Sequence, residues 1–239
     1  MPNADLQILA LDTATQSCSA ALVREGESFL EDKPAGGHSE SILSMADAAL
    51  KRAGTALGEC GAVAFGAGPG AFTGLRVACG VAQGLAWAKE KPVVPVGNLE
   101  ALAYRILADE PEGTRILACF DARMRQSYCA VYEKRGEADA PAEIEAPRLA
   151  NPEELPGIAR KAGVSVAAGS ALGAFPEAFE SLADVRKMPA AGVNAEDIGR
   201  LALVLFRAGK AVPAEQAAPL YIRNRVALTI EQRAAGEKL

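Results

Sequence analysis

The sequence predicts an α/β protein made of two duplicated domains, each a mixed sheet flanked by helices. Three observations predict this class. First, each half opens with an apolar run, a polar turn and a segment of alternating apolar and polar residues. Second, segments with the apolar spacing of strands then alternate with segments that have the spacing of helices. Third, short segments of the first half reappear in the second. With 239 residues, the chain is long enough for one large domain or two of roughly 100 residues each.

The first half opens with strand-like periods. The apolar run at 8–11 is followed by the polar turn D-T-A-T-Q-S and by an alternating segment at 18–23, which predicts a strand, a turn and a strand. A third strand is expected around 28–31. From 39 to 53 the apolar residues take helical spacing, and Gly54 is a natural stop for this helix.

A glycine-rich loop follows. The apolar segment at 62–65 predicts a short buried strand, and it leads through residues 66–76 into a helix expected to end near Lys89. Pro92 then bounds another short strand, V-V-P-V.

The second half echoes the first. I-L-A-L-D-T-A at 8–14 resembles I-L-A-C-F-D-A at 116–122, and the ten residues from 17 align without gaps with the ten from 127. V-A-F-G-A-G at 63–68 is echoed by V-A-A-G-S-A at 166–171. These echoes favour a duplicated domain. Two such halves facing a cleft form the actin-like plan shared by actin-like ATPases and sugar kinases, built on ribonuclease H-like domains.

The predicted division of the chain places the first domain at 1–100 and the second at 101–211. The hinge is expected between 98 and 113, where E-P-E-G breaks the pattern. Residues 212–230 are expected to pack back on the first domain, and 231–239 to form a flexible tail.

Composition limits the function. Apolar residues make up 50% of the chain and charged residues 23%, as in ordinary soluble proteins, and the net charge is −5. A large nucleic-acid footprint needs clustered Lys and Arg, so any RNA contact is expected to be shared with a partner. A weak exception is the locally basic stretch from Pro219 onward, with Arg223, Arg225, Arg233 and Lys238.

The cysteines and the N-terminus indicate the cytoplasm. The five cysteines lack the short paired spacings of zinc sites, which is typical of reduced, buried thiols. The N-terminal residues resemble no signal peptide, and no stretch approaches the roughly 20 apolar residues of a membrane span.

Two segments are candidates for binding phosphate. Asp12, Thr13 and Thr15 follow the first strand, where polar side chains and turn amides hold phosphate or a metal-bound water, or simply satisfy a tight turn. In the loop at 66–76, Thr73 is placed to cap the next helix, whose free amides attract anions. The loop matches neither the dinucleotide nor the P-loop spacing, so a structural role is equally open. The candidate phosphate contacts are Asp12, Thr13, Gly68, Gly70, Thr73 and Arg76.

The helix after this loop carries Gly80 and Gly84. Each internal glycine costs about 1 kcal/mol relative to alanine, and the close approach of another helix would offset that cost. Met45 and Ala48 widen the apolar stripe of the preceding helix beyond one face. Packing within the domain and contact with another chain both fit these features.

His38 is the only histidine of the chain. Zinc sites with two histidines, and nucleophile pairs that need a second histidine, are therefore excluded. Ile42 stands one turn after His38, and an H-E-x-x-H motif is absent, so we expect no metal site in this chain.

At these segments the chain resembles the TsaB (YeaZ) family. The resemblance covers most of the chain and lies in I-L-A-L-D-T-A-T, in H-S-E at 38–40, in G-P-G-A-F-T-G-L-R at 68–76 and in P-L-Y-I-R at 219–223. Ala71 departs from the serine that the family often has. The resemblance implies a bacterial subunit needed to make N6-threonylcarbamoyladenosine, next to the anticodon of tRNAs that read codons beginning with A.

The resemblance also implies partners. The catalytic relative TsaD shares the fold and binds a metal through an H-x-x-x-H helix, whose second histidine is replaced here by Ile42. It implies a non-catalytic chain that forms a homodimer alone, or a heterodimer with TsaD through its first two helices, joined by the ATPase TsaE. ATP or ADP and metal would belong to the partners or the assembled interface, and tRNA would be bound through the complex. The expected contact residues are His38, Ile42, Met45, Ala46, Ala49, Val77, Val81 and Gly84.

Two other functions stay open. An active actin-like phosphotransferase would use Asp12 to position a metal-bound phosphate, with the 66–76 loop holding the nucleotide. Its acidic counterpart in the second half would be Asp121, which Arg123 and Arg125 crowd. A glycoprotease is least favoured, because the chain has a single histidine.

Overall fold

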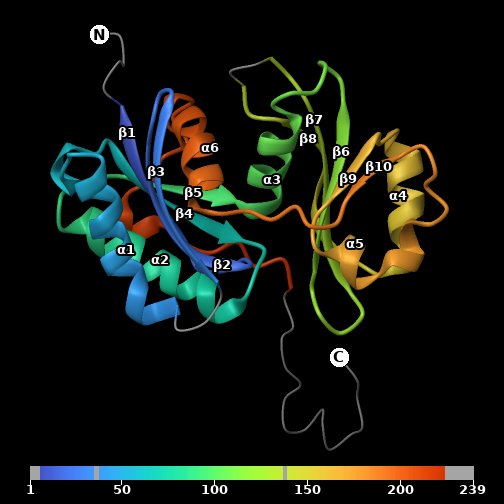
Figure 1. The fold of residues 1–239 in the computed structure, drawn as a ribbon, viewed down its shortest axis with the longest axis horizontal. Helices are drawn as coiled ribbons and strands as arrows, with labels where there is room; N and C mark the ends of the chain where they lie inside the picture. The colour runs from blue at the N-terminus through green and yellow to red at the C-terminus, as the bar shows by residue number, and fades with distance from the viewer. Residues whose placement is uncertain (1–5, 35–37, 137–138, 224–239) are drawn as a thin grey trace, which may run out of the picture.

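The computed structural model describes residues 6–34, 38–136 and 139–223, without the side chains of residues 38–40. The predicted tail at 231–239 lies outside these residues. Two sheets of five strands each lie side by side in the described part of the chain (Figure 1). None of its helices is long and apolar enough to cross a membrane.

The first sheet has the strand order β3-β2-β1-β4-β5. Its strands are β1 (Gln7–Asp12), β2 (Ser17–Arg24), β3 (Glu27–Pro34), β4 (Ala62–Gly68) and β5 (Val93–Gly97). Ile8 of β1 opposes Val23 in the antiparallel β1–β2 pair and Ala62 in the parallel β1–β4 pair. The predicted opening of strand, turn and strand is confirmed. β3 is longer than predicted, because it pairs with β2 along its whole length.

Helices cover both faces of this sheet (Figure 1). One face packs against α1 (His38–Arg52) and α2 (Phe72–Trp87), and the other against α3 (Asn98–Leu107) and α6 (Ala195–Arg207). Every residue of the parallel strand β4 is therefore buried, which explains its continuous apolar sequence. The first helix predicted for this half is confirmed within one residue at each end. The second ends within two residues of the predicted Lys89 but begins at Phe72, inside the predicted loop.

The second sheet repeats the first. Read from β8, its order is β8-β7-β6-β9-β10, with two antiparallel pairs followed by two parallel pairs, as in the first sheet. Its strands are β6 (Arg115–Asp121), β7 (Ser127–Glu133), β8 (Ala142–Ala150), β9 (Val166–Ala168) and β10 (Arg186–Met188), and its helices are α4 (Leu155–Ala162) and α5 (Ala171–Ala174). Short 3-10 turns lie at Leu57–Glu59, Pro152–Glu154, Pro176–Phe179 and Ala214–Gln216. The predicted fold class, two duplicated domains with mixed sheets flanked by helices, is confirmed.

The division of the chain differs in one element from the predicted ranges. α6 falls within 101–211, the range predicted for the second domain, yet it packs on the first sheet. Its apolar face joins the core around Ile8 and Val23, and Gly199 lets it approach closely, since a Cβ there would lie 2.4 Å from Val23 Cγ2. The chain thus returns to the first domain at α6. α3, in the predicted hinge, contacts both β5 and β6.

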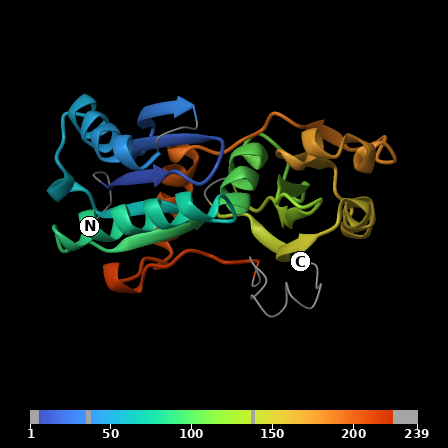
Figure 2. The same ribbon diagram turned by 90° about the horizontal axis from the view of Figure 1, so that it is seen from below.

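After α6 the chain runs beneath the first domain toward the second (Figure 2). Val212 and Val93 exchange backbone hydrogen bonds of 2.8 Å, and the turn Ala214–Gln216 contacts α2. We call residues 217–223 the C-terminal strap. In it, the Leu220 amide donates to the Ala67 carbonyl at 2.7 Å, and Arg223 Nη2 donates to the Ala122 carbonyl of the second domain at 3.0 Å. The strap therefore connects the two domains.

Candidate functional site

A cleft of about 690 Å³ lies between the two domains. The turn after β1, the loop before α2 and the end of β6 all reach it, and so does the C-terminal strap. Its lining residues are Ala14, Thr15, Gln16, Pro69, Gly70, Ala71, Phe72, Phe120, Asp121, Ala122, Arg123, Met124, Tyr128, Ser170, Gly192, Val193 and Arg223.

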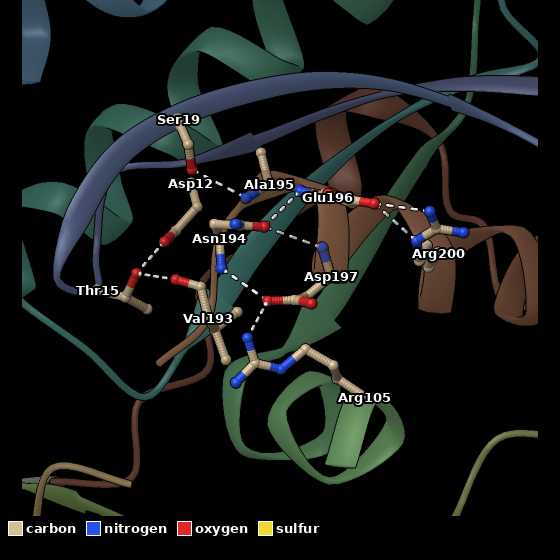
Figure 3. A network of polar contacts seen from close by, with 10 residues as sticks. All are labelled: Asp12, Thr15, Ser19, Arg105, Val193, Asn194, Ala195, Glu196, Asp197 and Arg200. Atoms are coloured by element: carbon tan, nitrogen blue, oxygen red, sulfur yellow. Dashed lines mark hydrogen bonds and ion pairs between the residues drawn. The ribbon is translucent and has the colours of Figure 1, made fainter. Parts of the chain in front are cut away.

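Asp12 ends β1 below this cleft and is completely buried. Its carboxylate accepts a hydrogen bond from the Ala14 amide at 3.0 Å. It also accepts one from the Thr15 hydroxyl, whose oxygen lies 2.8 Å from the Val193 carbonyl oxygen (Figure 3). Burial raises the pKa of Asp12 from 3.8 to about 6, although the bonds from Thr15 and Ala14 offset part of the effect. Thr15 has one hydroxyl proton for two acceptors, so protonated Asp12 allows both hydrogen bonds to form at once.

The glycine-rich loop is pressed against the turn after β1. Thr13 donates its hydroxyl proton to the Gly74 carbonyl at 2.6 Å, and the Ala71 amide donates to the Ala14 carbonyl at 2.8 Å. A Cβ at Gly74 would lie 2.0 Å from the Thr13 carbonyl oxygen, and one at Gly70 would lie 2.4 Å from that of Ala14. These contacts support the structural reading of the loop, in which glycine permits the close approach of two backbones.

The N-terminus of α6 follows Gly192 and Val193, which line the cleft, and it is held by polar contacts (Figure 3). Asn194 Oδ1 accepts from the amides of Glu196 and Asp197, at 2.9 and 3.2 Å, while the Asn194 amide donates to the Asp197 carboxylate. Ser19 on β2 accepts from the Ala195 amide at 2.9 Å. The first-turn amides of α6 are thus satisfied by the chain itself.

The second domain contributes one acidic group to the cleft. Asp121 Oδ1 accepts from the Arg123 amide at 2.8 Å, and its Oδ2 lies 3.2 Å from Arg123 Nη1. The crowding of Asp121 by an arginine, expected from the sequence, is therefore found in the structure. Both carboxylate oxygens of Asp121 therefore contact Arg123, two positions later in the same turn.

The outward faces of α1 and α2 form a second surface. Gly80 and Gly84 are exposed on α2, and a Cβ at either would meet nothing within 4 Å. Val77 and Val81 beside them are half-buried, and Leu43 on α1 is 54% exposed. The cost of two glycines inside α2 is therefore not offset by packing within this chain.

The chain is similar over nearly its whole length to proteins of one family. The family profile described as "TsaD: tRNA N6-adenosine threonylcarbamoyltransferase" matches residues 33–230. The Escherichia coli K12 protein named "tRNA threonylcarbamoyladenosine biosynthesis protein TsaB" is 36% identical over 226 residues, which cover 93% of this chain and 96% of the relative. The chain belongs to the TsaB family.

Other TsaB relatives and YeaZ structures agree with this membership. The Haemophilus influenzae TsaB protein is 34% identical, with 93% of this chain and 95% of the relative covered. The structure titled "YeaZ from Pseudomonas aeruginosa" superposes with a TM-score of 0.78 at 34% identity, covering 90% of this chain and 99% of that one. A second Pseudomonas aeruginosa structure, of a protein described as similar to peptidase YEAZ, gives a TM-score of 0.81 at 35% identity, with 91% and 100% covered.

Of the six phosphate contacts predicted from the sequence, only Gly70 lines the cleft. Asp12 and Thr13 are buried beneath it, and Gly68 is covered by the strap, since a Cβ there would lie 2.8 Å from the Leu220 carbonyl oxygen. Thr73 is not the predicted cap. α2 begins at Phe72, so its N-cap is Ala71, which makes no side-chain cap hydrogen bond.

The interface residues predicted on α1 need correction. Ile42, Met45, Ala46 and Ala49 are buried in the chain's own core, so they offer no surface to a partner. Their apolar stripe faces the first sheet instead. The His38 side chain lies outside the described residues. In this TsaB family member, Val77, Val81 and Gly84 are the predicted contact residues that reach the surface.

Sequence reasoning missed two residues that shape the cleft. Asn98, at the start of α3, is buried, and its Nδ2 donates to the Pro69 carbonyl at 3.1 Å, which holds the loop before α2. Phe72 lines the cleft and contacts Tyr221 of the strap, with the two rings tilted by 41° and their centroids 5.8 Å apart. A polar residue directly after a buried strand was the only sequence signal for Asn98, and nothing local linked Phe72 to a residue so far along the chain.

Proposed function

We propose that this chain is a non-catalytic, accessory subunit of the complex that attaches threonylcarbamoyl to N6 of the adenosine next to the anticodon, in tRNAs that read codons beginning with A. It works in the cytoplasm with a TsaD-like catalytic subunit and a TsaE-like ATPase. The observation that carries the proposal is the match to TsaB proteins over 93% of this chain and 96% of the relative.

The cleft supports a non-catalytic role. A phosphotransferase of this fold needs an accessible carboxylate at the end of the first strand, and Asp12 has no exposed surface. Its oxygens are engaged by Thr15 and the Ala14 amide, and burial disfavours its charged form. Asp121, which does reach the cleft, is paired with Arg123. We therefore assign ATP or ADP, and metal, to the partner subunits or the assembled interface.

We place the partner contact on the outward faces of α1 and α2. Leu43, Val77, Val81 and the exposed Gly80 and Gly84 form its centre. Two exposed glycines one helical turn apart allow another helix to approach closely, and the apolar side chains beside them give that helix something to bury. A homodimer and a TsaD-type heterodimer would use the same face, so they exclude each other.

Reconstitution tests the proposed function. Unmodified tRNA is incubated with the TsaD-like and TsaE-like partners, ATP and threonylcarbamoyl-adenylate, with this chain present, absent or alone. We expect modification only when this chain and its partners are both present. Undiminished modification without this chain, or ATP turnover by this chain alone, would contradict the proposal.

Co-purification tests the interface. Gly84→Arg places a long charged side chain on the exposed face of α2 and is expected to abolish capture of the TsaD-like partner. Gly157→Arg is the matched control, because Gly157 is also an exposed helical glycine with nothing within 4 Å of a Cβ, and it lies on α4 of the other domain. Equal capture by both variants would refute this placement of the interface.

A further inference from the structure

Exposed apolar side chains gather at the mouth of the interdomain cleft. In the described residues seven large apolar side chains are exposed, and four of them lie here, on three separate segments. Phe72 starts α2 and is 42% exposed, Met124 lies in the turn after β6 and is 62% exposed, and Leu220 and Tyr221 belong to the strap. Single exposed apolar residues are ordinary, but such a group marks a binding surface.

Arg76 joins the aromatic part of this surface. Its guanidinium carbon lies 3.8 Å from the centroid of the Phe72 ring, and its Nε donates to the Tyr221 hydroxyl at 3.1 Å. The Phe72 and Tyr221 rings lie 5.8 Å apart, centroid to centroid. One planar cation and two rings therefore form a continuous cluster from two segments that are far apart in sequence.

The opposite side of the mouth carries more arginines. Arg123, Met124 and Arg125 all have positive φ angles, of 61°, 55° and 54°. This conformation is unfavourable for residues other than glycine. The side chains of Arg123 and Arg125 are 88% and 76% exposed. Arg223 follows Tyr221 in the strap and contacts this turn at Met124 Sδ, at 3.2 Å, and at the Ala122 carbonyl, so the strap connects the two sides.

Carboxylates only partly balance these charges. Arg123 pairs with Asp121 at 3.2 Å and Arg125 with Glu153 at 3.6 Å, and the cationic partner of each pair is highly exposed. Arg125 and Glu153 are both exposed, and such a pair is weak and screened by salt, so a phosphate can replace Glu153. Arg123 is 88% exposed and can meet a phosphate while it stays paired with Asp121. The chain as a whole has a net charge of −5, but arginines gather at this surface, so it is locally basic.

We propose that this surface binds a single-stranded segment of RNA. Unpaired bases stack on the Phe72, Tyr221 and Arg76 planes, and the phosphates lie against Arg123 and Arg125. Rings and guanidinium planes recognise base faces, which a duplex hides and a loop or an unpaired strand exposes. The proposal rests on the proposed function, since the RNA would be the tRNA substrate. A protein partner is the alternative. It agrees less well with this surface, because the centre of a protein–protein interface usually contains few charged residues.

The electrostatic part is tested by a salt titration. The full chain, in complex with its TsaD-like partner, is titrated with a labelled anticodon stem-loop RNA and with a blunt duplex of the same stem. For Arg123→Gln with Arg125→Gln, we expect the slope of log affinity against log salt to fall by about 1.4, or about 0.7 per lost phosphate contact. Lys161→Gln with Lys187→Gln is the matched control: the same charge change on exposed cations of the same domain.

The stacking part is tested by removing the rings. Phe72→Leu with Tyr221→Leu keeps apolar packing but removes both planes, and we expect binding of the stem-loop to weaken roughly tenfold or more, with little change for the duplex. Tyr221→Phe keeps the ring and should bind like the unmodified chain. Trp87→Ala, at the far end of α2, controls for loss of an exposed aromatic side chain.

The outcomes separate this inference from the proposed function. RNA affinity unchanged in both the arginine and the ring variants would overturn the inference, even where reconstituted modification still requires the chain. Loss of partner capture by these variants with RNA affinity intact would assign the surface to a protein and also overturn it. If tRNA modification does not require this chain, the proposed function is wrong. The RNA-binding inference is then still tested, because RNA affinity is measured directly.

Discussion

Gly74 and Gly80, on the same helix, provide a direct test of the contact that buries Asp12 and Thr13. A Cβ at Gly74 would lie 2.0 Å from the Thr13 carbonyl oxygen, 2.7 Å from its carbonyl carbon and 2.8 Å from Ala14 Cα. All three are backbone atoms, so no side chain can rotate away. Gly80 is exposed, and a Cβ there would meet nothing within 4 Å.

The magnitudes follow from these distances. Ordinary contact begins at 3.4 Å, so α2 in the Gly74→Ala variant must retreat by about 1.4 Å, the difference from 2.0 Å. Overpacking of this kind costs about 1–3 kcal/mol. The shift also breaks the buried hydrogen bond from Thr13 to the Gly74 carbonyl, which contributes about 1 kcal/mol. Gly80→Ala should instead stabilise the chain by about 0.5–1 kcal/mol, because alanine favours the helix.

Urea unfolding measures the difference. Far-UV circular dichroism and the fluorescence of Trp87, the only tryptophan, report on the unfolding of the chain. We expect the free energies of unfolding of Gly74→Ala and Gly80→Ala to differ by about 2.5–5 kcal/mol, in favour of Gly80→Ala. If the two variants are equally stable, the turn after β1 does not hold α2 as the distances indicate, and the structural reading of the glycine-rich loop fails.

Three further predictions concern buried titratable groups. Burial raises the pKa of Asp12 from 3.8 to about 6, so the contribution of Asp12 to the free energy of unfolding declines as pH rises between these values. From pH 4 to 7, the free energy of unfolding of Asp12→Asn should therefore rise by up to about 3 kcal/mol relative to that of the unmodified chain. A difference that does not change with pH would contradict this. Burial, and secondarily Glu143, raise the pKa of Glu100 from 4.5 to about 7, so Glu100→Gln should gain stability over that range, and Glu143→Gln should reproduce only a small part of the gain. All five cysteines are buried, and burial raises the pKa of each thiol. At pH 8, Ellman's reagent should therefore react slowly with the native chain, whereas all five thiols should react after unfolding. Rapid reaction of the native chain would show that the domains open readily.

Local patterns allowed most of the fold to be predicted. Apolar periodicity located the strands and the two helices of the first half, and the echo of 8–14 at 116–122 revealed the repeat, because both depend on neighbouring residues. The same patterns do not specify which sheet a helix covers. α6 follows the second sheet in sequence, but the apolar face around Ile198 and Leu201 is buried on the first sheet.

The candidate site was predicted less completely. The sequence places Asp12 and Thr13 at the end of a strand. Polar residues at such a position can either line a cleft or be buried beneath it, and the sequence does not distinguish the two. Their burial comes from contacts with Gly74 and Val193, which are 61 and 178 positions away from Thr13 and Thr15. Helical periodicity likewise found an apolar stripe at Ile42, but a stripe of this kind looks the same whether it faces its own sheet or another chain.

The sequence by itself determined the repeat, the class of the fold and, through its resemblance to TsaB proteins, the expected role in tRNA modification. Only the tertiary structure decided which residues are accessible: it buried Asp12 and Ile42, exposed Gly80 and Gly84, and brought Tyr221 onto Phe72 and Arg76. The physical reason is that burial depends on contacts between segments far apart in the chain, whereas strand and helix formation depend on residues a few positions apart.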